Sequence, residues 1–326
     1  MRVVAVIVAY NRRDLLLECL QALRDQTRTL DEVVVVDNAS SDGSADAVAE
    51  LFADVDLVRL PVNTGGAGGF AIGIERAIDA RHADLVWIMD DDTIPTATAL
   101  ERLLEARAAL RETPAILASR VVWTDGLDHP MNTPRAKPIA SVAERRDAAA
   151  AACLPVRSAS FVSLLVEADA VRVSGAPVAE YFIWNDDFEF TSRILRRRRG
   201  VFVPASVVLH KTKARADTDA DPGARFYYEV RNKLWLFRRS AALAWYELPL
   251  YGAATARRWT RTFLRSPDRA TIRDGFRRGW HDGTASSPRS NDEFFASLGI
   301  GEVPAAPPAG RDGTEAARGA SNEGDR

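Results

Sequence analysis

Four short apolar runs, rich in valine, stand out in the first hundred residues. Each has the length and composition of a strand that is buried on both faces, and helical spacing of apolar residues separates one run from the next. Strands that alternate with helices predict a parallel sheet with right-handed crossovers, which is a doubly wound α/β domain. The four predicted strands are Val3–Ala9, Val33–Val36, Leu57–Leu60 and Leu85–Met89.

The alternation continues with less regularity to about residue 216. Its later part consists of predicted helices at Ala97–Leu110 and Asn185–Arg199 and predicted strands at Ala115–Trp123, Ser160–Val166 and Val201–Leu209. Between them, Thr124–Leu154 is rich in turn residues and alanine and is expected to form a variable loop. Helical spacing returns over residues 217–300, and residues 301–326 have the Pro-, Ala- and Gly-rich composition of a disordered tail.

Composition excludes several classes of protein. Hydrophobic residues make up 47% and charged residues 27% of the 326 residues, enough apolar surface for a globular core. A formal net charge of -2 gives no indication of nucleic-acid binding. The two cysteines, Cys19 and Cys153, provide neither a disulfide framework nor a metal motif. The sequence shows no signal peptide and no apolar run of membrane-spanning length, so we expect a cytoplasmic protein.

Three consecutive acids, Asp90, Asp91 and Asp92, directly follow the fourth predicted strand. In an open parallel sheet, ligands bind beyond the carboxyl ends of the strands. Like charges at such an end repel one another unless a cation is present. Alternate residues of an extended segment point the same way, so Asp90 and Asp92 can share one ion, and oxygen ligands suit Mg²⁺ or Mn²⁺. The alternative is a solvated turn that caps the helix after Pro95.

A glycine-rich segment, Gly65–Gly69, precedes a helix that the pattern predicts over Ala71–Ala80. Backbone amides in such a segment can approach a phosphate or a sugar closely. The segment matches neither the dinucleotide fingerprint nor the P-loop, and by itself it is only a turn signal. Its position between Asp37 and Asp90 in the same predicted sheet favours a role in ligand binding.

A second acidic pair, Asp186 and Asp187, lies in the first turn of a predicted helix, where the helix dipole favours ionised carboxylates. An ionised carboxylate in a cleft can remove a proton from an acceptor hydroxyl as a general base. Aromatic residues precede the pair, and a ring such as that of Trp184 can form a platform for a sugar. Capping of the helix by Asn185 explains the acids equally well, so both interpretations stand.

Two later features have alternative interpretations. His210 ends the last predicted strand, and a lone histidine is more often structural than a ligand. Residues 251–280 contain eight arginines and two acids. Such a stretch fits peripheral contact with an anionic membrane surface or, alternatively, a solvated helical hairpin packed on the catalytic domain.

Three motifs, taken in order, resemble the inverting family 2 glycosyltransferases of the GT-A fold. They are Val3–Arg12, the pair Val36–Asn38 with Ser41–Ser44, and Trp87–Asp92. The resemblance covers roughly residues 1 to 235. It implies a GT-A catalytic domain over residues 1–216, with a nucleotide-sugar half at about 1–123 and an acceptor half at about 124–216, followed by the helical, partly basic extension.

Within that family, Asn63–Phe70, Phe182–Asp187 and His210 resemble the galactofuranosyltransferases of the actinobacterial cell wall. The resemblance implies a UDP-sugar donor and a divalent cation, Mn²⁺ or Mg²⁺, on Asp90, Asp92 and His210. It implies Asp186 as the catalytic base and Asp187, with Trp184, as acceptor-binding residues. The implied nucleotide-sugar contacts are Ala9, Tyr10, Asn11, Asp37, Asn63, Gly65, Gly66, Asp90 and Asp91.

The implied reaction is a single in-line displacement that inverts the transferred sugar. The expected donor is UDP-galactofuranose, and the expected acceptor is a glycan or polyprenyl-linked glycolipid in cell-wall or surface-polysaccharide synthesis, at the inner face of the cell membrane. Rhamnosyltransferases that use dTDP-rhamnose are the alternative, and a non-catalytic nucleotide-sugar-binding module is a remoter one. A dinucleotide-dependent oxidoreductase is disfavoured, because Tyr10-Asn11-Arg12 follows the first strand where that class carries its glycine fingerprint.

Overall fold

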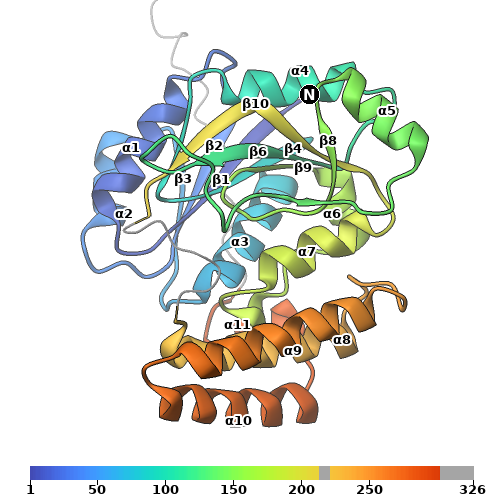
Figure 1. Ribbon diagram of the computed structural model, residues 1–326. Coiled ribbons are helices and arrows are strands. Elements are labelled where there is room, and N and C mark those ends of the chain that lie inside the picture. The colour runs from blue at the N-terminus through green and yellow to red at the C-terminus, as the bar shows by residue number, and fades with distance from the viewer. Residues whose placement is uncertain (213–220, 302–326) are drawn as a thin grey trace, which may run out of the picture.

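The computed structural model describes residues 1–212 and 221–301, which form an α/β domain and a group of C-terminal helices packed against it (Figure 1). The strands are β1 (Val3–Ala9), β2 (Glu32–Asp37), β3 (Asp56–Arg59), β4 (Leu85–Asp90), β5 (Thr93–Pro95), β6 (Ile116–Val122), β7 (Arg135–Ala136), β8 (Leu154–Ser158), β9 (Leu164–Glu167) and β10 (Gly200–His210). The helices of the α/β domain are α1 (Arg13–Arg24), α2 (Ser44–Leu51), α3 (Gly65–Glu75), α4 (Ala99–Ala109), α5 (Val142–Ala150), α6 (Ala168–Ser174) and α7 (Asp186–Leu195), with the helical turns η1 (Arg76–Ala80) and η2 (Ala179–Tyr181).

The strands of the described residues form one sheet in the order β3-β2-β1-β4-β9-β6-β10-β8-β7, with β5 paired to β10 outside this path. β1 is parallel to β2 and β4, β2 is parallel to β3, and β6 is parallel to β10. β9 lies antiparallel between β4 and β6, and β5 and β8 run antiparallel to β10. The predicted α/β fold with a mostly parallel, doubly wound sheet is therefore confirmed, and its antiparallel strands are concentrated in the second half.

Side chains on the two faces of β1 enter two different hydrophobic cores, because successive residues of a strand point to opposite sides of a sheet. Val4 and Val6 pack with residues of α3, α6 and α7. Ala5 and Ile7 pack with residues of α1, α2 and α4. Helices thus cover both faces of the sheet (Figure 1). A strand with no exposed face accounts for the unbroken apolar run at the start of the sequence.

The helix α3 begins at Gly65 and not at Ala71, where the pattern placed it. Glycine has a low helix propensity, so the sequence pattern started the helix too late. The glycines let α3 lie close to the sheet: a Cβ added at Gly73 would lie 2.5 Å from Cγ1 of Val6, and the sheet approaches Gly69 as closely. The glycine run therefore consists of the first turns of a closely packed helix and is not a loop.

The segment 124–154, predicted as a variable loop, instead contains β7, α5 and the first residue of β8. The side chain of Ser141 caps α5 by accepting a hydrogen bond from the backbone N–H of Glu144, and Ala148 is buried. Alanine is the best helix former, so the alanine run that was interpreted as loop composition stabilises this helix.

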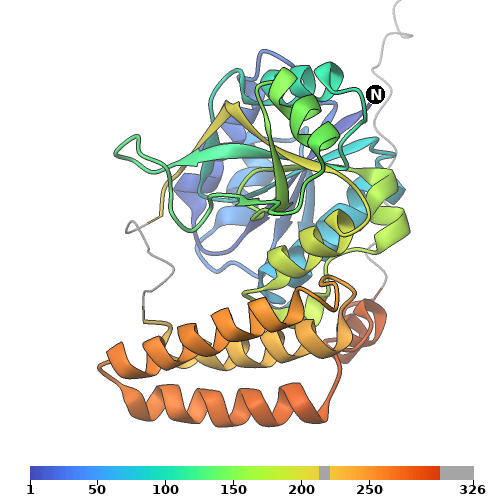
Figure 2. The same ribbon diagram turned by 45° about the vertical axis from the view of Figure 1, so that its right-hand side comes forward.

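The C-terminal region consists of α8 (Phe226–Arg239), α9 (Leu248–Arg265), α10 (Arg269–Ala285) and α11 (Asn291–Ser297), preceded by the turn η3 (Gly223–Arg225). In both views α10 lies farthest from the sheet, with α8 and α9 between it and the α/β domain (Figure 2). A small core, built on Phe226, Val230 and Ile272, joins the helices. Within the described ranges, no helix has both the length and the apolar composition needed to cross a bilayer.

The predicted boundaries of the C-terminal region stay predictions. Residues 213–220 and 302–326 lie outside the described residues. They include the predicted boundary near residue 217 and all but the first residue of the predicted tail, 301–326.

Replacing Gly73 by alanine should destabilise the protein, although alanine is the better helix former by about 1 kcal/mol. The added methyl group would overlap Val6 in the sheet, and overpacking of this kind costs about 1–3 kcal/mol. Gly66→Ala is the matched control in the same helix, because nothing lies within 4 Å of a Cβ at that position. Denaturant unfolding followed by circular dichroism should give a lower free energy of unfolding for Gly73→Ala than for Gly66→Ala. Equal values would contradict the close packing.

Candidate active site

Two acids and a histidine meet at the carboxyl edge of the sheet. Asp90 ends β4, Asp92 lies in the turn that follows, and His210 ends β10. One ligand atom from each of these three residues lies within 4.8 Å of the others. The short strand β5 brings them together, because it follows Asp92 directly and pairs with β10 so that Thr93 lies opposite His210. The structure thus assembles the predicted trio.

The surroundings of His210 and Asp92 fit a divalent cation. Nε2 of His210 lies 3.0 Å from Oδ1 of Asp92, and its Nδ1 lies 3.0 Å from Oδ1 of Asn132. A polar partner on the second ring nitrogen is what orients histidine ligands in metal sites. Oδ1 of Asp92 is buried, and its close polar neighbour is Nε2 of His210. Two carboxylates and an imidazole whose ligand atoms converge form a donor set that a cation would complete.

The acids of this cluster repel one another. Burial and then the charge of Asp92 raise the pKa of Asp90 to about 7. Burial also raises the pKa of Asp91 to about 6, against the effect of Arg12. Burial acts on Asp92 in the same direction, but His210 and Arg12 outweigh it and lower the pKa of this carboxyl. Since a bound cation favours ionised carboxylates, it would oppose the burial and the repulsion that raise the first two pKa values.

Arg12 is a site residue that the sequence reasoning missed. Its Nη1 lies 2.9 Å from Oδ1 of Asp91 and 2.7 Å from Oδ2 of Asp92. The backbone N–H of Tyr10 donates to the other oxygen of Asp91 at 3.0 Å. The β1–α1 loop thus engages both oxygens of Asp91, whose predicted contact with the nucleotide sugar stays a prediction. A basic residue in the loop after β1, near the acids that follow another strand, was the signal that could have identified Arg12.

The other predicted nucleotide-sugar contacts surround the ends of β1 and β2. Asp37 ends β2 and is buried, and its Oδ1 has no hydrogen-bond partner. Oδ1 of Asn11 accepts a hydrogen bond from the backbone N–H of Ser41 at 2.8 Å. Oδ1 of Asn63 accepts from the backbone N–H of Gly65 at 2.8 Å. An unsatisfied buried oxygen at Asp37 leaves an acceptor for a ligand donor.

Three more predicted contacts lie along the same edge. Ala9 is the last residue of β1 and is buried beside Asp37, with which it pairs in the sheet. Tyr10 is exposed directly after it. Gly66 lies in the first turn of α3 with open space around the position of a Cβ. These residues therefore line the edge of the sheet at which the acids gather.

Asn38 is a second residue that the sequence reasoning did not assign to the site. Its Nδ2 donates to the carbonyl of Gly65 at 2.9 Å, and its Oδ1 accepts from the backbone N–H of Thr64 at 2.8 Å. This fully buried amide fixes the start of α3 to the end of β2.

The loop that precedes the second acidic pair, residues 181–185, docks directly on the start of α3, and we call it the aromatic–acidic loop. Gly65 has a φ of 72°, and a Cβ at this position would overlap the carbonyl oxygen of Phe182. The same oxygen accepts a hydrogen bond from the backbone N–H of Ala67 at 3.2 Å. Only glycine combines this conformation with so close an approach. The glycine-rich segment and the aromatic–acidic loop, far apart in the sequence, therefore form one surface.

The aromatic–acidic loop is held in a strained backbone conformation. Phe182, Trp184 and Asn185 have positive φ values of 64°, 67° and 65°. Such values cost energy for residues with a side chain. Nδ2 of Asn232 in α8 offsets part of this cost by donating to three carbonyls of the loop, those of Tyr181, Ile183 and Trp184, at 2.9, 3.0 and 2.9 Å.

Glu229 in α8 connects this loop to α9. Asn185, which we expected to cap α7, makes no capping bond, and its Nδ2 donates instead to Oε2 of Glu229 at 2.9 Å. The guanidinium of Arg258 lies 3.1 Å from the same oxygen, and Nε1 of Trp259 donates to Oε1 at 3.3 Å. The C-terminal helices are thus part of the support of the site.

Asp186 and Asp187 begin α7 next to this loop, as the sequence predicted. Burial and the charge of Asp187 raise the pKa of Asp186 well above its usual value. Burial also raises the pKa of Asp187, while the cations Arg135 and Lys233 act in the opposite direction. Burial therefore outweighs the helix dipole, which had led us to expect two ionised carboxylates. A carboxylate whose pKa is raised is a stronger base once it has lost its proton.

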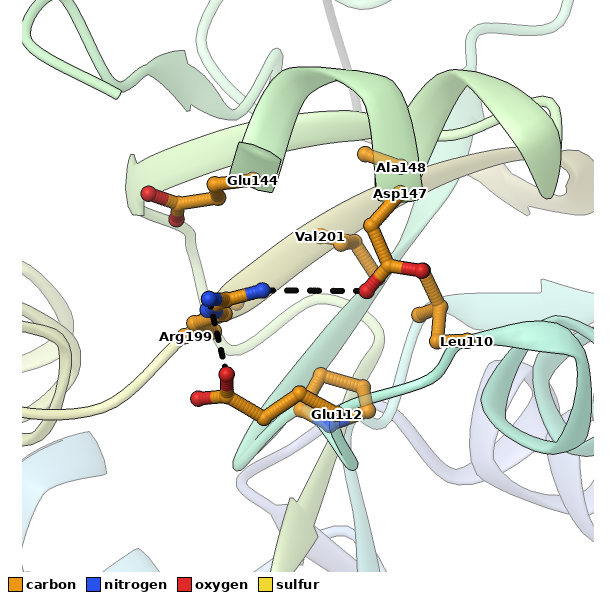
Figure 3. A pocket seen from close by; sticks show the side chains of 9 residues that line it. Leu110, Glu112, Glu144, Asp147, Ala148, Arg199 and Val201 are labelled. Atoms are coloured by element: carbon orange, nitrogen blue, oxygen red, sulfur yellow. Dashed lines mark ion pairs between the residues drawn. The ribbon is translucent and has the colours of Figure 1, made fainter. Parts of the chain in front are cut away.

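A separate small cavity lies at the opposite end of β10. Its volume is about 10 Å³, room for about one water molecule. Arg199 lines it, and its guanidinium lies 2.7 Å from Glu112 and 3.7 Å from Asp147 (Figure 3). It is lined by Gly200, the first residue of β10, whereas His210 is the last. This ion-paired cavity is therefore distinct from the candidate active site.

With the fold and the site described, the chain can be compared with known proteins. Residues 4–149 match the family model "Glycosyl transferase family 2". The chain is 33% identical over 209 residues to galactofuranosyltransferase GlfT1 of Mycobacterium tuberculosis H37Rv, a match that covers 60% of this chain and 64% of the relative. It is 31% identical over 202 residues to GlfT1 of Mycolicibacterium smegmatis, covering 60% of this chain and 65% of that protein. The chain therefore spans just under two thirds of the length of these relatives.

The fold is that of solved glycosyltransferase structures. The 1–349 part of TarS from S. aureus in complex with UDP-GlcNAc superposes with a TM-score of 0.60 at 14% identity, over 92% of this chain and 88% of that one. The complex of the same protein with UDP gives a TM-score of 0.53 at 14% identity, over 92% of both chains. The chain has the GT-A fold, and its resemblance to family 2 glycosyltransferases, and among them to galactofuranosyltransferases, is confirmed.

Asn232→Ala should loosen the aromatic–acidic loop, because it removes the side-chain donor to three carbonyls. The loss of a buried amide donor costs about 1–3 kcal/mol. Hydrogen exchange measured by mass spectrometry should become faster over residues 179–187 in this variant. Arg238→Ala is the control on the same helix, since this exposed residue donates only to Thr284 of α10 among the bonds described for it. Unchanged exchange in Asn232→Ala would show that the loop holds its conformation without this support.

Proposed function

We propose that the chain is a metal-dependent inverting glycosyltransferase that transfers a sugar from a UDP-sugar to an acceptor hydroxyl. The observation that carries this proposal is the placement of two acidic clusters on one surface. Asp90, Asp92 and His210 gather at the sheet edge, and Asp186 follows the loop that is docked on Gly65. An inverting transfer places the group that stabilises the leaving UDP and the base on opposite sides of one sugar.

Asp90, Asp92 and His210 would hold a divalent cation, Mn²⁺ or Mg²⁺. When bound, the ion would supply positive charge to the diphosphate of the leaving UDP. The buried carboxylate of Asp92, with Nε2 of His210 3.0 Å from its Oδ1, supports this assignment. Arg12, which lies against Asp91 and Asp92, would fix the loop on the nucleotide side of the ion.

The edge formed by β1, β2 and α3 would bind the nucleotide sugar. The buried Oδ1 of Asp37 is free to accept a hydrogen bond from a base or ribose of the donor. The open space beside Gly66 supports close approach of a sugar or phosphate to the backbone. Asn11 and Asn63 would act chiefly by holding the two loops that border this edge.

Asp186 would be the general base, removing the proton of the acceptor hydroxyl as its oxygen attacks the anomeric carbon and the bond to UDP breaks. Asp187 and Trp184 would position the acceptor. The cations Arg135 and Lys233 favour the ionised form of Asp187, so the proton that the buried pair shares would reside on Asp186 before reaction. Ionisation of Asp186 would then be the step that prepares the base.

The relatives favour galactofuranose as the donor sugar, with UDP-galactofuranose as the substrate and a glycan or polyprenyl-linked glycolipid of the cell wall or cell surface as the acceptor. We propose the inner face of the cell membrane as the place of reaction. A dTDP-rhamnose-dependent transferase is the second candidate, because it would use the same metal and base. The intact acidic clusters disfavour a non-catalytic binding module.

Asp186→Asn should reduce sugar transfer by about a hundredfold or more, because loss of a general base costs that much, while UDP binding changes little. Initial rates of UDP release with UDP-galactofuranose and a soluble acceptor would measure transfer, and isothermal titration with UDP would measure binding. Asp169→Asn, at an acid in the first turn of the distant helix α6, is the matched control. Normal turnover by Asp186→Asn would remove this residue from the mechanism, and loss confined to Asp187→Asn would assign the base to its neighbour.

Asp92→Asn should abolish stabilisation of the protein by Mn²⁺. A ligand that binds only the folded state adds about 2.7 kcal/mol at a concentration a hundred times its Kd, so the wild-type melting temperature should rise with added Mn²⁺. Glu50→Gln, at an exposed acid of α2, should respond like the wild type. An unchanged Mn²⁺ response in Asp92→Asn would place the metal elsewhere.

A further inference from the structure

The helix α9 has a long outer face that no other described element covers. Leu250, Ala253, Ala254, Arg257 and Leu264 lie on one stripe of this helix, because they are spaced at three, four, seven and fourteen residues. All five are exposed, and the relative exposure of Leu250 and Leu264 is 69% and 60%. Figure 2 shows α9 running along the outside of the helical group. We call these five residues the outer face of α9.

Two large aromatic side chains directly precede this helix. Trp245 is 81% exposed and Tyr246 is 57% exposed, and their rings are 5.8 Å apart in an edge-to-face arrangement. Single exposed apolar residues are common on protein surfaces, but a group of this size beside an apolar helix face marks an interaction site. Trp and Tyr with one apolar and one polar end are the residues that favour a membrane–water interface.

The charge of the same helix favours an anionic partner. The sequence of α9 contains four arginines and no acidic residue, and Arg257 stands in the middle of the outer face. On the neighbouring α10, by contrast, Asp274 lies within 3.3 and 2.7 Å of Arg277 and Arg278 and neutralises part of its charge. Apolar side chains with interspersed arginine and without acids are typical of helices that lie in the headgroup region of anionic bilayers.

The inner side of α9 contacts the support of the active site. Arg258 and Trp259 both bind Glu229, which in turn accepts a hydrogen bond from Asn185, the residue before Asp186. The outer face therefore lies about one helix diameter, roughly 10 Å, from this network. A surface attached to the outer face would present its headgroup region close to the proposed base.

We propose that the outer face of α9, together with Trp245 and Tyr246, docks on an anionic lipid bilayer and thereby brings a lipid-linked acceptor to Asp186. The inference deepens the proposed function, on which its second half rests. It also moves the expected membrane contact toward α9 and the residues just before it, where the acid Glu247 is bound by Arg157. The contact moves away from residues 266–280, whose exposed Phe276 and Trp280 share α10 with Asp274. The contact is peripheral, with the helix lying in the plane of the interface.

Flotation of the full chain with lipid vesicles tests the docking surface. Wild-type protein should float with phosphatidylcholine vesicles that contain phosphatidylglycerol and much less with pure phosphatidylcholine. The double variant Leu250→Glu/Leu264→Glu should bind the anionic vesicles roughly tenfold more weakly or worse, and the milder Trp245→Ala/Tyr246→Ala should also lose binding. Val173→Glu, which places one such charge on a similarly exposed apolar site of α6 (72% exposed), should bind like the wild type.

The rate of transfer to a soluble acceptor separates this inference from the proposed function. Both α9-region variants should keep the wild-type rate with that acceptor, whereas transfer to an acceptor embedded in vesicles should fall with vesicle binding. Binding of the two variants equal to the wild type, or no vesicle binding by the wild type, would overturn the docking surface. Light scattering provides a second test of the docking surface. If the wild type is a dimer, and Leu250→Glu/Leu264→Glu converts it to a monomer without changing vesicle binding, the outer face joins two copies and the docking surface is overturned. Absence of transfer to any acceptor, with vesicle binding intact, would instead overturn the proposed function.

Discussion

The contact between Gly65 and the carbonyl oxygen of Phe182 is the interaction on which the site depends most. It joins the start of α3, which Asn38 fixes to the end of β2, to the loop that leads into Asp186 and Asp187. A side chain at Gly65 would separate the two halves, because φ there is 72° and the space is occupied by backbone. The metal trio is fixed by the sheet, and this one close approach determines where the acidic pair lies relative to it.

Support for this contact comes from parts of the chain whose relation to the site is not visible in the sequence. Asn38 holds the start of α3 from one side, and Asn232 holds the strained loop from the other. The C-terminal helices therefore do more than extend the fold, since α8 provides Asn232 and Glu229, and α9 binds Glu229 in turn. The same linkage gives the outer face of α9 its significance, because a membrane contact there would be coupled to the loop beside the proposed base.

Much of the fold and the two acids at the end of β4 could be predicted from local sequence patterns, whereas His210 joined them only through the family resemblance. Buried parallel strands are continuous apolar runs, and acids at a strand end lie at a sheet edge in any doubly wound fold. The sequence could not reveal Asn38 or Asn132, since their roles depend on which side chains tertiary packing brings within reach, whereas the basic Arg12 after the first strand was a signal that was missed. It also misplaced the start of α3 and the helix α5, because glycine and alanine were interpreted by composition when close packing and helix propensity decided the outcome. The raised pKa values of Asp186 and Asp187 arise from burial, which a helix-dipole argument does not include.

In the proposed mechanism a cation and a base face each other across one sugar, and that arrangement allows only one stereochemical outcome. Attack on the side opposite the leaving UDP must invert the anomeric centre, whichever donor the protein uses. Nuclear magnetic resonance of the product formed from an α-linked UDP-sugar and a soluble acceptor measures the configuration of the new bond directly. The account predicts a β-linked product. An α-linked product would show that the sugar is transferred with retention, and the single displacement built on Asp186 would then be wrong.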